Sequence, residues 1–436
     1  MNDLSLFLPC AAGVESYLAA EVRRITGVSD AQEFRAGVAL QTSWRDVLKL
    51  NLHSRLAQRV LVQLWHGPYR SEQDLYTAAA DVAWEIWFTP RQTIKVEVTA
   101  QRSPLKSLNF AALKIKDAVC DRFRDRRGER PSVDTARPDV RIYAHLTAET
   151  LSLSIDTSGE PLFKRGWRED KGDAPLKETL AAAMIAATGW DAAAELPLDD
   201  IPPLYDPCCG SGTVAIEAAQ IALRVAPGLQ RRFGFEKLLP FQPHVWHALK
   251  DEAAKQRREW PPGHKPIVFG SDVSFRMVDF AQRNAERAGV AHALELRGGD
   301  ALQRMPPSER PGVLLLNPPY GERIAAAGVA GRSARERADE RAGARPPRTF
   351  TVGRESAQLS DGSADAEGSD FFARLAAHWK SHYAGWTAWL LTPDLKLPGK
   401  MRFKESRRVP LWNGPIECRL FRFDLTARRA PPTGGG

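Results

Sequence analysis

The sequence of 436 residues contains no apolar run that approaches the ~18 residues needed to span a bilayer. Its N-terminus lacks a positively charged segment before a short apolar stretch, so we predict no signal peptide. The five cysteines are scattered and odd in number, and no C-x-x-C pair occurs. These absences argue against a membrane protein, a disulfide-bonded secreted domain and a zinc site. We therefore expect a cytoplasmic protein without a bound metal.

Apolar residues make up 43% of the chain, which is enough for two or three folded domains. The net charge of +8 favours a polyanionic partner such as RNA. Nine basic and four acidic residues lie between positions 102 and 130. The alternative is a basic enzyme whose charges are simply solvated. We predict that RNA contacts Arg102, Lys106, Lys114, Lys116, Arg124, Arg126 and Arg127.

The first ~160 residues combine helical and alternating apolar patterns, which predict small α+β layers. Helices are expected over 15–26, around 48–56 and over 108–123, with strands over 93–99, 140–146 and 151–155. The last two strands should form a hairpin. In the third helix, we expect Leu108, Ile115, Val119 and Phe123 to face inward.

After Gly159 the pattern changes to alternating strands and helices, which predicts a doubly wound sheet of parallel strands. Helices are expected over 176–188, 213–225, 275–288 and 371–383, with strands over 204–205, 267–269, 294–297, 313–316, 387–391 and 416–423. Residues 325–369 are rich in Ala, Gly, Ser, Arg and acids, and we predict a disordered insertion there. The tail 426–436 is predicted to be disordered as well.

Residues 206–213 read Asp-Pro-Cys-Cys-Gly-Ser-Gly-Thr and form an informative turn. Gly210 and Gly212 allow the backbone to approach a ligand closely, and Thr213 begins a helix whose free N–H groups favour a carboxylate. S-adenosylmethionine carries such a carboxylate. The alternative is a tight strand–helix connection without a ligand. A dinucleotide or phosphate loop fits poorly, because the turn lacks both G-x-G-x-x-G and G-K-[ST].

Two acidic residues, Asp272 and Asp300, end the next two predicted strands. A carboxylate at Asp272 can accept both ribose hydroxyls of a nucleoside cofactor, and Asp300 is placed to meet the adenine amino group. Singly, each could instead cap a helix or lie on the surface. In this order, however, they predict a cofactor site. We expect it to comprise Asp206, Pro207, Cys209, Gly210, Ser211, Gly212, Thr213, Asp272, Val273, Asp300 and Ala301.

Residues 317–320 read Asn-Pro-Pro-Tyr and follow a fully apolar strand. An exocyclic amine is a poor nucleophile because its lone pair is delocalised into the base. Accepting its two N–H hydrogens on the Asn317 side chain and the Pro318 carbonyl would favour a tetrahedral nitrogen. Tyr320 can stack on the base, and the prolines limit backbone reorganisation. The alternative is a proline-rich turn. We predict that the catalytic residues are Asn317, Pro318, Pro319 and Tyr320.

Several spaced motifs carry a family resemblance over residues 1–324 and 370–425. They are 112–117, 130–134, 138–140, 163–168, 174–179, 206–213, 226–228 and 317–323. With them, the chain resembles the THUMP-containing class I methyltransferases, most closely the bacterial 23S rRNA guanine-N2-methyltransferases. The resemblance implies a ferredoxin-like segment over 1–45, a THUMP-like RNA-binding domain over 46–157 and a Rossmann-like methyltransferase domain over 158–425.

Two features depart from that family pattern. Some relatives carry a second methyltransferase domain at the C-terminus, whereas this chain ends near the end of the first, so we expect one activity. The insertion 325–369 lies beside the predicted target pocket, and we expect it to be tolerated there rather than to contact RNA.

The resemblance implies transfer of a methyl group from S-adenosylmethionine to N2 of one guanine in 23S rRNA or a pre-ribosomal particle. A tRNA guanine-N2-methyltransferase is the nearest alternative. Adenine-N6 DNA methyltransferases and protein-glutamine methyltransferases share Asn-Pro-Pro-Tyr, but neither substrate needs an RNA-docking domain. A non-catalytic RNA-binding or ribosome-assembly protein is a further alternative, which the cofactor and amine motifs argue against.

Overall fold

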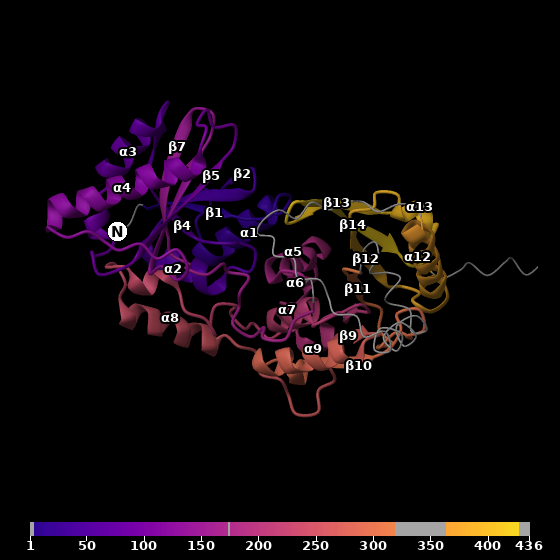
Figure 1. The fold of residues 1–436 in the computed structure, drawn as a ribbon. Helices are drawn as coiled ribbons and strands as arrows, with labels where there is room; N and C mark the ends of the chain where they lie inside the picture. The colour runs from indigo at the N-terminus through magenta and orange to yellow at the C-terminus, as the bar shows by residue number, and fades with distance from the viewer. Residues whose placement is uncertain (1–3, 173–174, 319–362, 427–436) are drawn as a thin grey trace, which may run out of the picture. The chain divides into compact units, whose positions relative to one another are not determined.

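A computed structural model describes residues 4–172, 175–318 and 363–426 of the chain. The described residues divide into two compact units. The first contains the residues up to Trp167, together with Glu178–Ala183 and Arg224–Arg258. The second contains the remainder, including both of the predicted site motifs. Figure 1 shows the chain from the indigo N-terminal strands to the yellow C-terminal hairpin.

The first unit is built on a seven-stranded mixed sheet with the order β2-β3-β1-β4-β7-β6-β5. Its strands are β1 (Leu4–Pro9), β2 (Gln32–Phe34), β3 (Gly37–Thr42), β4 (Leu61–Pro68), β5 (Ile94–Ala100), β6 (Val140–Leu146) and β7 (Thr150–Asp156). Its helices are α1 (Glu15–Thr26), α2 (Trp44–His53), α3 (Glu72–Asp81), α4 (Leu108–Arg127) and α8 (Pro243–Lys255). Strand β4 pairs with both β1 and β7, so one sheet runs through the whole N-terminal region. The predicted α+β character and the hairpin of β6 and β7 are confirmed.

Serine caps fix where several of these helices begin. Ser43 Oγ accepts a hydrogen bond from the Asp46 backbone N–H at the start of α2, and Ser107 Oγ accepts one from Phe110 at the start of α4. Such caps satisfy backbone donors that have no partner within the helix. In α4 the prediction for Leu108 was wrong, because its side chain is 38% exposed. Ala111, four residues before the buried Ile115, takes the inward position instead.

The second unit is built on a seven-stranded sheet with the order β10-β9-β8-β11-β12-β14-β13. Its strands are β8 (Leu204–Asp206), β9 (Val268–Asp272), β10 (Leu294–Gly298), β11 (Val313–Leu316), β12 (Thr387–Thr392), β13 (Arg407–Asn413) and β14 (Ile416–Asp424). The helices of this part of the chain are α5 (Glu178–Thr188), which spans both units, α6 (Trp190–Ala193), α7 (Thr213–Ala222), α9 (Phe275–Arg287), α12 (Ser363–His382) and α13 (Leu397–Met401). Short 3-10 helices lie at Trp84–Ile86, Leu198–Asp200, Gly234–Lys237 and Ala291–Ala293.

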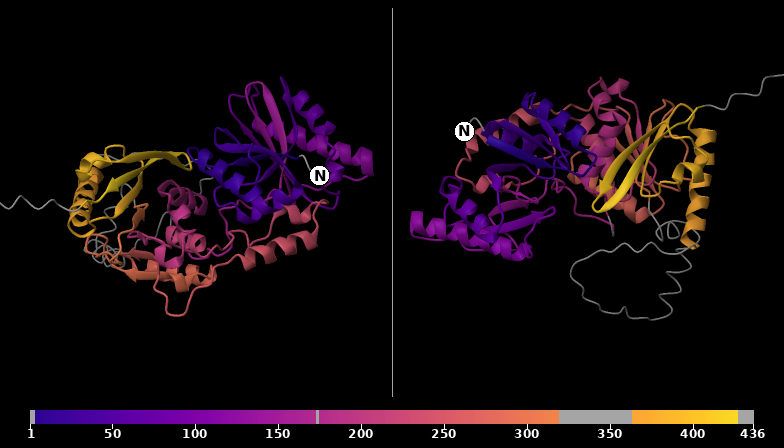
Figure 2. Two further views of the ribbon diagram at one scale, coloured as in Figure 1. Left: turned by 180° about the vertical axis from the view of Figure 1, so that it is seen from behind. Right: turned by 90° about the horizontal axis from the view of Figure 1, so that it is seen from above.

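The doubly wound arrangement is confirmed, but the prediction of parallel strands throughout was wrong. Strand β14 runs antiparallel to both of its neighbours, β12 and β13 (Figure 2). The short turn at Gly414 joins β13 and β14, and such a hairpin connection requires these two strands to be antiparallel to each other. Strands β10, β9, β8, β11 and β12 pair in parallel, as expected.

Part of the predicted insertion is ordered. Residues 319–362 lie outside the described residues, but α12 begins at Ser363 and therefore includes 363–369. Alanine and glutamate, both good helix formers, lie just ahead of the apolar residues that this helix buries, such as Phe372 and Leu375. The tail is described only to residue 426. Within the described ranges, no helix is long and apolar enough to cross a membrane.

Candidate active site

The strand order of the second unit reverses between β8 and β11. These two strands are parallel neighbours, with Leu204 beside Val313 and Tyr205 beside Leu314. From β8 the chain continues outward to β9 and β10, whereas β12 lies on the other side of β11. Ligands of open α/β sheets bind at such a reversal, outside the carboxyl ends of the strands. The predicted turn follows β8, and Asn317 and Pro318 follow β11, so the fold brings the turn and the first half of the catalytic motif to this edge.

The turn after β8 is tied to β9 by its backbone. The Cys209 N–H donates to the Ser271 carbonyl at 2.9 Å, and the Gly212 N–H donates to the Cys209 carbonyl at 2.8 Å. Gly210 and Gly212 have φ values of 53° and 88°, in the left-handed region that favours glycine. A Cβ on Gly212 would lie 2.9 Å from Ala281 Cβ, whereas one on Gly210 would enter open space. The turn therefore leaves room above Gly210 and lies against α9 at Gly212.

Asp206 ends β8 and is almost completely buried, with 2% of its surface exposed. Its Oδ1 accepts a hydrogen bond from the Cys208 N–H at 3.0 Å. Burial raises the pKa of Asp206 to about 8, and the nearby Asp272 carboxylate acts in the same direction. Pro207 and Cys209 are buried in the same turn. Burial also raises the pKa of the Cys209 thiol, so it is an uncharged packing group here.

Asp272, at the end of β9, is in direct contact with the turn. Its Oδ2 accepts a hydrogen bond from the Gly210 N–H at 3.0 Å, and its Oδ1 accepts one from Ser274 at 2.8 Å. Asp300 follows β10, and its Oδ1 accepts a hydrogen bond from Leu302 at 2.9 Å. Val273 is half-buried and Ala301 is buried beside these acids. The predicted cofactor-binding residues thus lie at the carboxyl ends of the adjacent strands β8, β9 and β10. Contact of each residue with the cofactor stays a prediction.

Asn317 and Pro318 directly follow β11. Asn317 is half-buried and Pro318 is buried. Pro319 and Tyr320 lie outside the described residues. Because β11 lies between β8 and β12, Asn317 leaves the sheet beside the glycine turn. The placement that the catalytic hypothesis requires is therefore present for the first two residues of the motif.

Three residues of this region were missed by the sequence analysis. Arg168 donates to Ser211 Oγ at 3.0 Å and to Thr213 Oγ1 at 2.7 Å, which places a guanidinium beside the first residues of α7. Asn284 is fully buried in α9 and donates to the Ser211 carbonyl at 3.1 Å. Arg168 lies in the motif 163–168 that resembles the methyltransferase family. No local sequence pattern, however, connects Arg168 or Asn284 to the turn.

Phe275 is the third missed residue, and 79% of its surface is exposed at the start of α9. A Cβ on Gly298, the last residue of β10, would lie only 2.4 Å from the Phe275 ring. The ring therefore lies against the end of β10. In the sequence, Phe275 follows Asp272 by three residues, and Gly298 precedes Asp300 by two. An exposed aromatic ring at a ligand-binding edge provides a flat apolar surface for a base. The helical pattern of α9 predicted this residue only as part of a helix.

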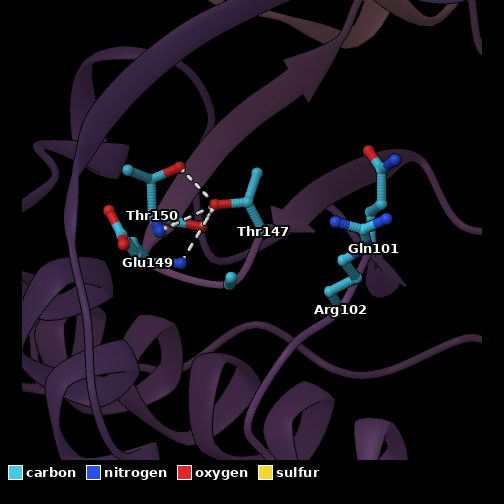
Figure 3. Close-up of a pocket in the computed structure, with 6 residues that line it drawn as sticks. Gln101, Arg102, Thr147, Glu149 and Thr150 are labelled. Carbon is cyan, nitrogen blue, oxygen red and sulfur yellow. Dashed lines mark hydrogen bonds between the residues drawn. The ribbon is translucent and has the colours of Figure 1, made fainter.

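The predicted RNA-binding residues of the first unit are only partly available. Arg102, Lys106, Arg124, Arg126 and Arg127 are exposed, whereas Lys114 and Lys116 are half-buried. Arg124 pairs with Asp121 at 2.8 Å and Lys116 with Asp117 at 2.5 Å. A pocket of ≈ 270 Å³ lies at the turn between β6 and β7 and is lined by Gln101, Arg102 and residues 147–150. Figure 3 shows its lining residues. RNA contact by this set stays a prediction.

Three family descriptions match consecutive parts of the chain. They are the RlmL ferredoxin-like domain over residues 5–61, the THUMP domain over 69–156 and the RMKL-like methyltransferase domain over 165–333. The chain belongs to the THUMP-containing RMKL-like methyltransferases. The family and fold class predicted from the sequence are therefore confirmed.

Curated relatives and solved structures agree with this family. The ribosomal RNA large subunit methyltransferase K/L of Psychromonas ingrahamii is 33% identical and aligns with 98% of this chain and 51% of its own. The protein of the same name from Shewanella pealeana is 34% identical, over 98% and 54%. The chain thus spans about half the length of the curated relatives it matches. SMU.472, solved in complex with SAH, has a TM-score of 0.78 at 25% identity and covers 99% of this chain and 100% of its own. TrmN from Thermus thermophilus, with a TM-score of 0.59 at 18% identity over 97% and 99%, shares the fold alone.

Proposed function

We propose that this THUMP-containing methyltransferase transfers a methyl group from S-adenosylmethionine to the exocyclic N2 of a guanine in 23S rRNA. The observation that carries the proposal is the position of Asn317, at the end of β11 and beside the glycine turn that follows β8. The names of the curated relatives support ribosomal RNA as the substrate. Such a substrate implies a cytoplasmic enzyme.

The residues at this edge fit S-adenosylmethionine. Arg168 and the N-terminus of α7 would hold its carboxylate, because both present positive charge and hydrogen-bond donors at the turn. Asp272 would accept the ribose hydroxyls and Asp300 the adenine amine, while Phe275 would lie against the base. When bound, the cofactor supplies a methyl group on a sulfonium, which is already an activated leaving group.

Asn317 and Pro318 would act on the target amine. The amide oxygen of Asn317 and the carbonyl of Pro318 would accept hydrogen bonds from its two N–H groups and so direct the nitrogen lone pair toward the methyl group. The methylated amine would then release one proton to solvent. Tyr320 would stack on the guanine. Two acceptors at this position suit an NH2 group, whereas guanine N7 carries no hydrogen for them to accept. The residues of the site therefore favour N2 over N7.

Product analysis tests the proposal directly. The purified protein is incubated with labelled S-adenosylmethionine and either unmodified 23S rRNA or tRNA, and the RNA is digested to nucleosides. Label in N2-methylguanosine from the rRNA is expected. rRNA already modified by the same protein is the control and should accept little label. Label only in N7-methylguanosine, or only in tRNA, would contradict the proposed position or substrate.

A further inference from the structure

Basic charge is concentrated near the C-terminal end of the second unit. Between positions 394 and 424 the sequence has eight basic and four acidic residues, so this short segment holds half of the net charge of +8. The segment includes α13, β13 and β14, drawn in yellow in Figures 1 and 2. An excess of basic over acidic residues in a short segment is a feature of surfaces that bind polyanions.

Half of these cations are neutralised by neighbours. The ion pairs are Lys400–Asp394 at 2.9 Å, Arg408–Glu405 at 2.7 Å, Arg419–Glu417 at 2.6 Å and Arg422–Asp424 at 2.8 Å. The remaining four, which we name the basic track, are Lys396, Arg402, Lys404 and Arg407. All four are exposed, and within the described part of the chain none has a carboxylate at ion-pairing distance.

The track begins at the edge of the sheet that carries Asn317. Strand β12 is the parallel neighbour of β11, with Leu390 beside Leu316, and it ends at Thr392. Lys396 follows just after this strand end, in the turn before α13. The track therefore starts next to the residues that would hold the target base.

The hairpin of β13 and β14 extends past the same edge. Thr392, the last residue of β12, pairs with Arg419 of β14, and Arg419 pairs with Pro410 of β13. From there the hairpin continues to the pair of Asn413 with Ile416. It thus projects beyond the end of β12, as the two views of Figure 2 show for the long yellow ribbon. The hairpin and α13 together border the catalytic edge on the β12 side.

The segment between α13 and β13 is held in place by packing and hydrogen bonds. Lys380 of α12 donates to the Arg402 carbonyl at 3.0 Å and lies 4.4 Å from the centre of the Phe403 ring. Leu397 and Met401 of α13 are buried. The backbone that carries the track is therefore anchored to the domain core, so its charges are presented from a fixed surface.

We propose that the basic track binds the phosphate backbone of the RNA strand that flanks the target nucleotide. This inference rests on the proposed function and adds a second RNA-binding surface, within the methyltransferase unit itself. Extraction of a base from its stack costs free energy, which contacts to the neighbouring phosphates can offset. Lys396 lies at the target edge, whereas Arg407 pairs with Arg422 opposite Trp389, in the first half of β12. The track therefore leads away from this edge, and its cations would attract the phosphates of an RNA strand that leaves the site in this direction.

Two matched double variants test this surface. Lys396→Ala with Arg407→Ala removes two charges of the track, whereas Lys400→Ala with Arg408→Ala removes the same number and types of charge from the paired set. RNA affinity is measured against salt concentration for each full-length protein, and affinity for S-adenosylhomocysteine is measured as a readout of an intact fold. Each lost phosphate contact lowers the slope of log affinity against log salt by about 0.7 to 0.9.

The track variant should bind RNA about tenfold more weakly, with a slope reduced by about 1.5, and bind S-adenosylhomocysteine like the wild type. The paired-set variant should change the slope by less than half as much. Equal losses in both variants, or unchanged RNA binding in the track variant, would overturn the proposal and leave the surface to another partner, such as an acidic protein. Methylation of rRNA by the wild-type protein is measured in parallel. If the wild type methylates rRNA, a negative result with the track variant contradicts the basic track alone and not the proposed function.

Discussion

The two glycines of the turn after β8 are expected to respond differently to the same change, an added methyl group. Gly210 has a φ of 53°, and its Cβ position has nothing within 4 Å. Gly212 has a φ of 88°, and its Cβ would lie 2.9 Å from Ala281 Cβ and 3.3 Å from Ile216 Cδ1. Gly210→Ala therefore tests the space above the turn, whereas Gly212→Ala tests the packing beneath it.

The expected energies follow from these surroundings. A non-glycine residue in the left-handed region costs about 1–2 kcal/mol, and both variants should lose this much stability. Gly212→Ala should lose about 1–3 kcal/mol more, because overpacking against α9 forces a shift of Ala281 or of the turn. Gly263→Ala is the control for the backbone cost alone, since Gly263 has a φ of 78° and open space around its Cβ position in a loop before β9.

The assays are calorimetric titration with S-adenosylhomocysteine and denaturant unfolding. Gly210→Ala should unfold like Gly263→Ala but bind the ligand at least about tenfold more weakly, because the methyl group occupies the space we assign to the cofactor. Gly212→Ala should be clearly the least stable of the three. Wild-type affinity in Gly210→Ala would refute the placement of the cofactor over the turn. Equal stability of the two turn variants would refute the packing argument.

Three further changes test individual residues. Arg168→Lys should weaken S-adenosylhomocysteine binding about tenfold in calorimetry, because a single ammonium nitrogen does not reproduce the two guanidinium nitrogens that donate separately to Ser211 and Thr213. An unchanged affinity would contradict its role. Phe275→Ala should weaken binding about three- to tenfold with little change in stability, because the ring is largely exposed; a loss of stability instead would identify a packing residue. Burial raises the folded-state pKa of Asp206 to about 8. The protonated carboxyl therefore stabilises the folded state fully below about pH 4. As the pH rises from there toward 8, the free energy of unfolding falls by about 1.4 kcal/mol per pH unit. Asp206→Asn should remove this loss, because asparagine does not ionise. Measured by denaturant unfolding without cofactor, the variant's stability relative to the wild type should increase from pH 5 to pH 8. A stability difference that stays constant with pH would contradict the raised pKa.

The sequence predicted the second unit best, because its strands are short apolar runs that end in polar motifs. Asp272 and Asp300 were predicted to end two successive strands, and the structure places them after the parallel neighbours β9 and β10. The direction of β14 was not predicted, because its alternating pattern is the same in a parallel or an antiparallel strand. The short turn at Gly414 indicates that β14 is antiparallel to β13, but not how β14 pairs with β12.

The contacts within the site could not be predicted in the same way. Arg168 reaches the turn from more than forty positions earlier, and its donation to Ser211 depends on the path of the connecting segment rather than on a local pattern. Phe275 looked like one apolar residue of an amphipathic helix, although the structure leaves it exposed. Leu108 shows the same error, since its spacing suggested burial but 38% of its surface is exposed. The spacing of apolar residues predicts a helix, but it does not determine whether other parts of the chain cover the residues at the ends of that helix.

Single-turnover methylation of rRNA by Asn317→Ala, with S-adenosylhomocysteine affinity measured on the same preparation, tests the central claim most directly. Loss of one preorganised acceptor should slow methyl transfer about 100- to 1000-fold, while cofactor affinity stays within about twofold of wild type. Methyl transfer at the wild-type rate in this variant would contradict the assignment of the Asn317 amide to the target amine.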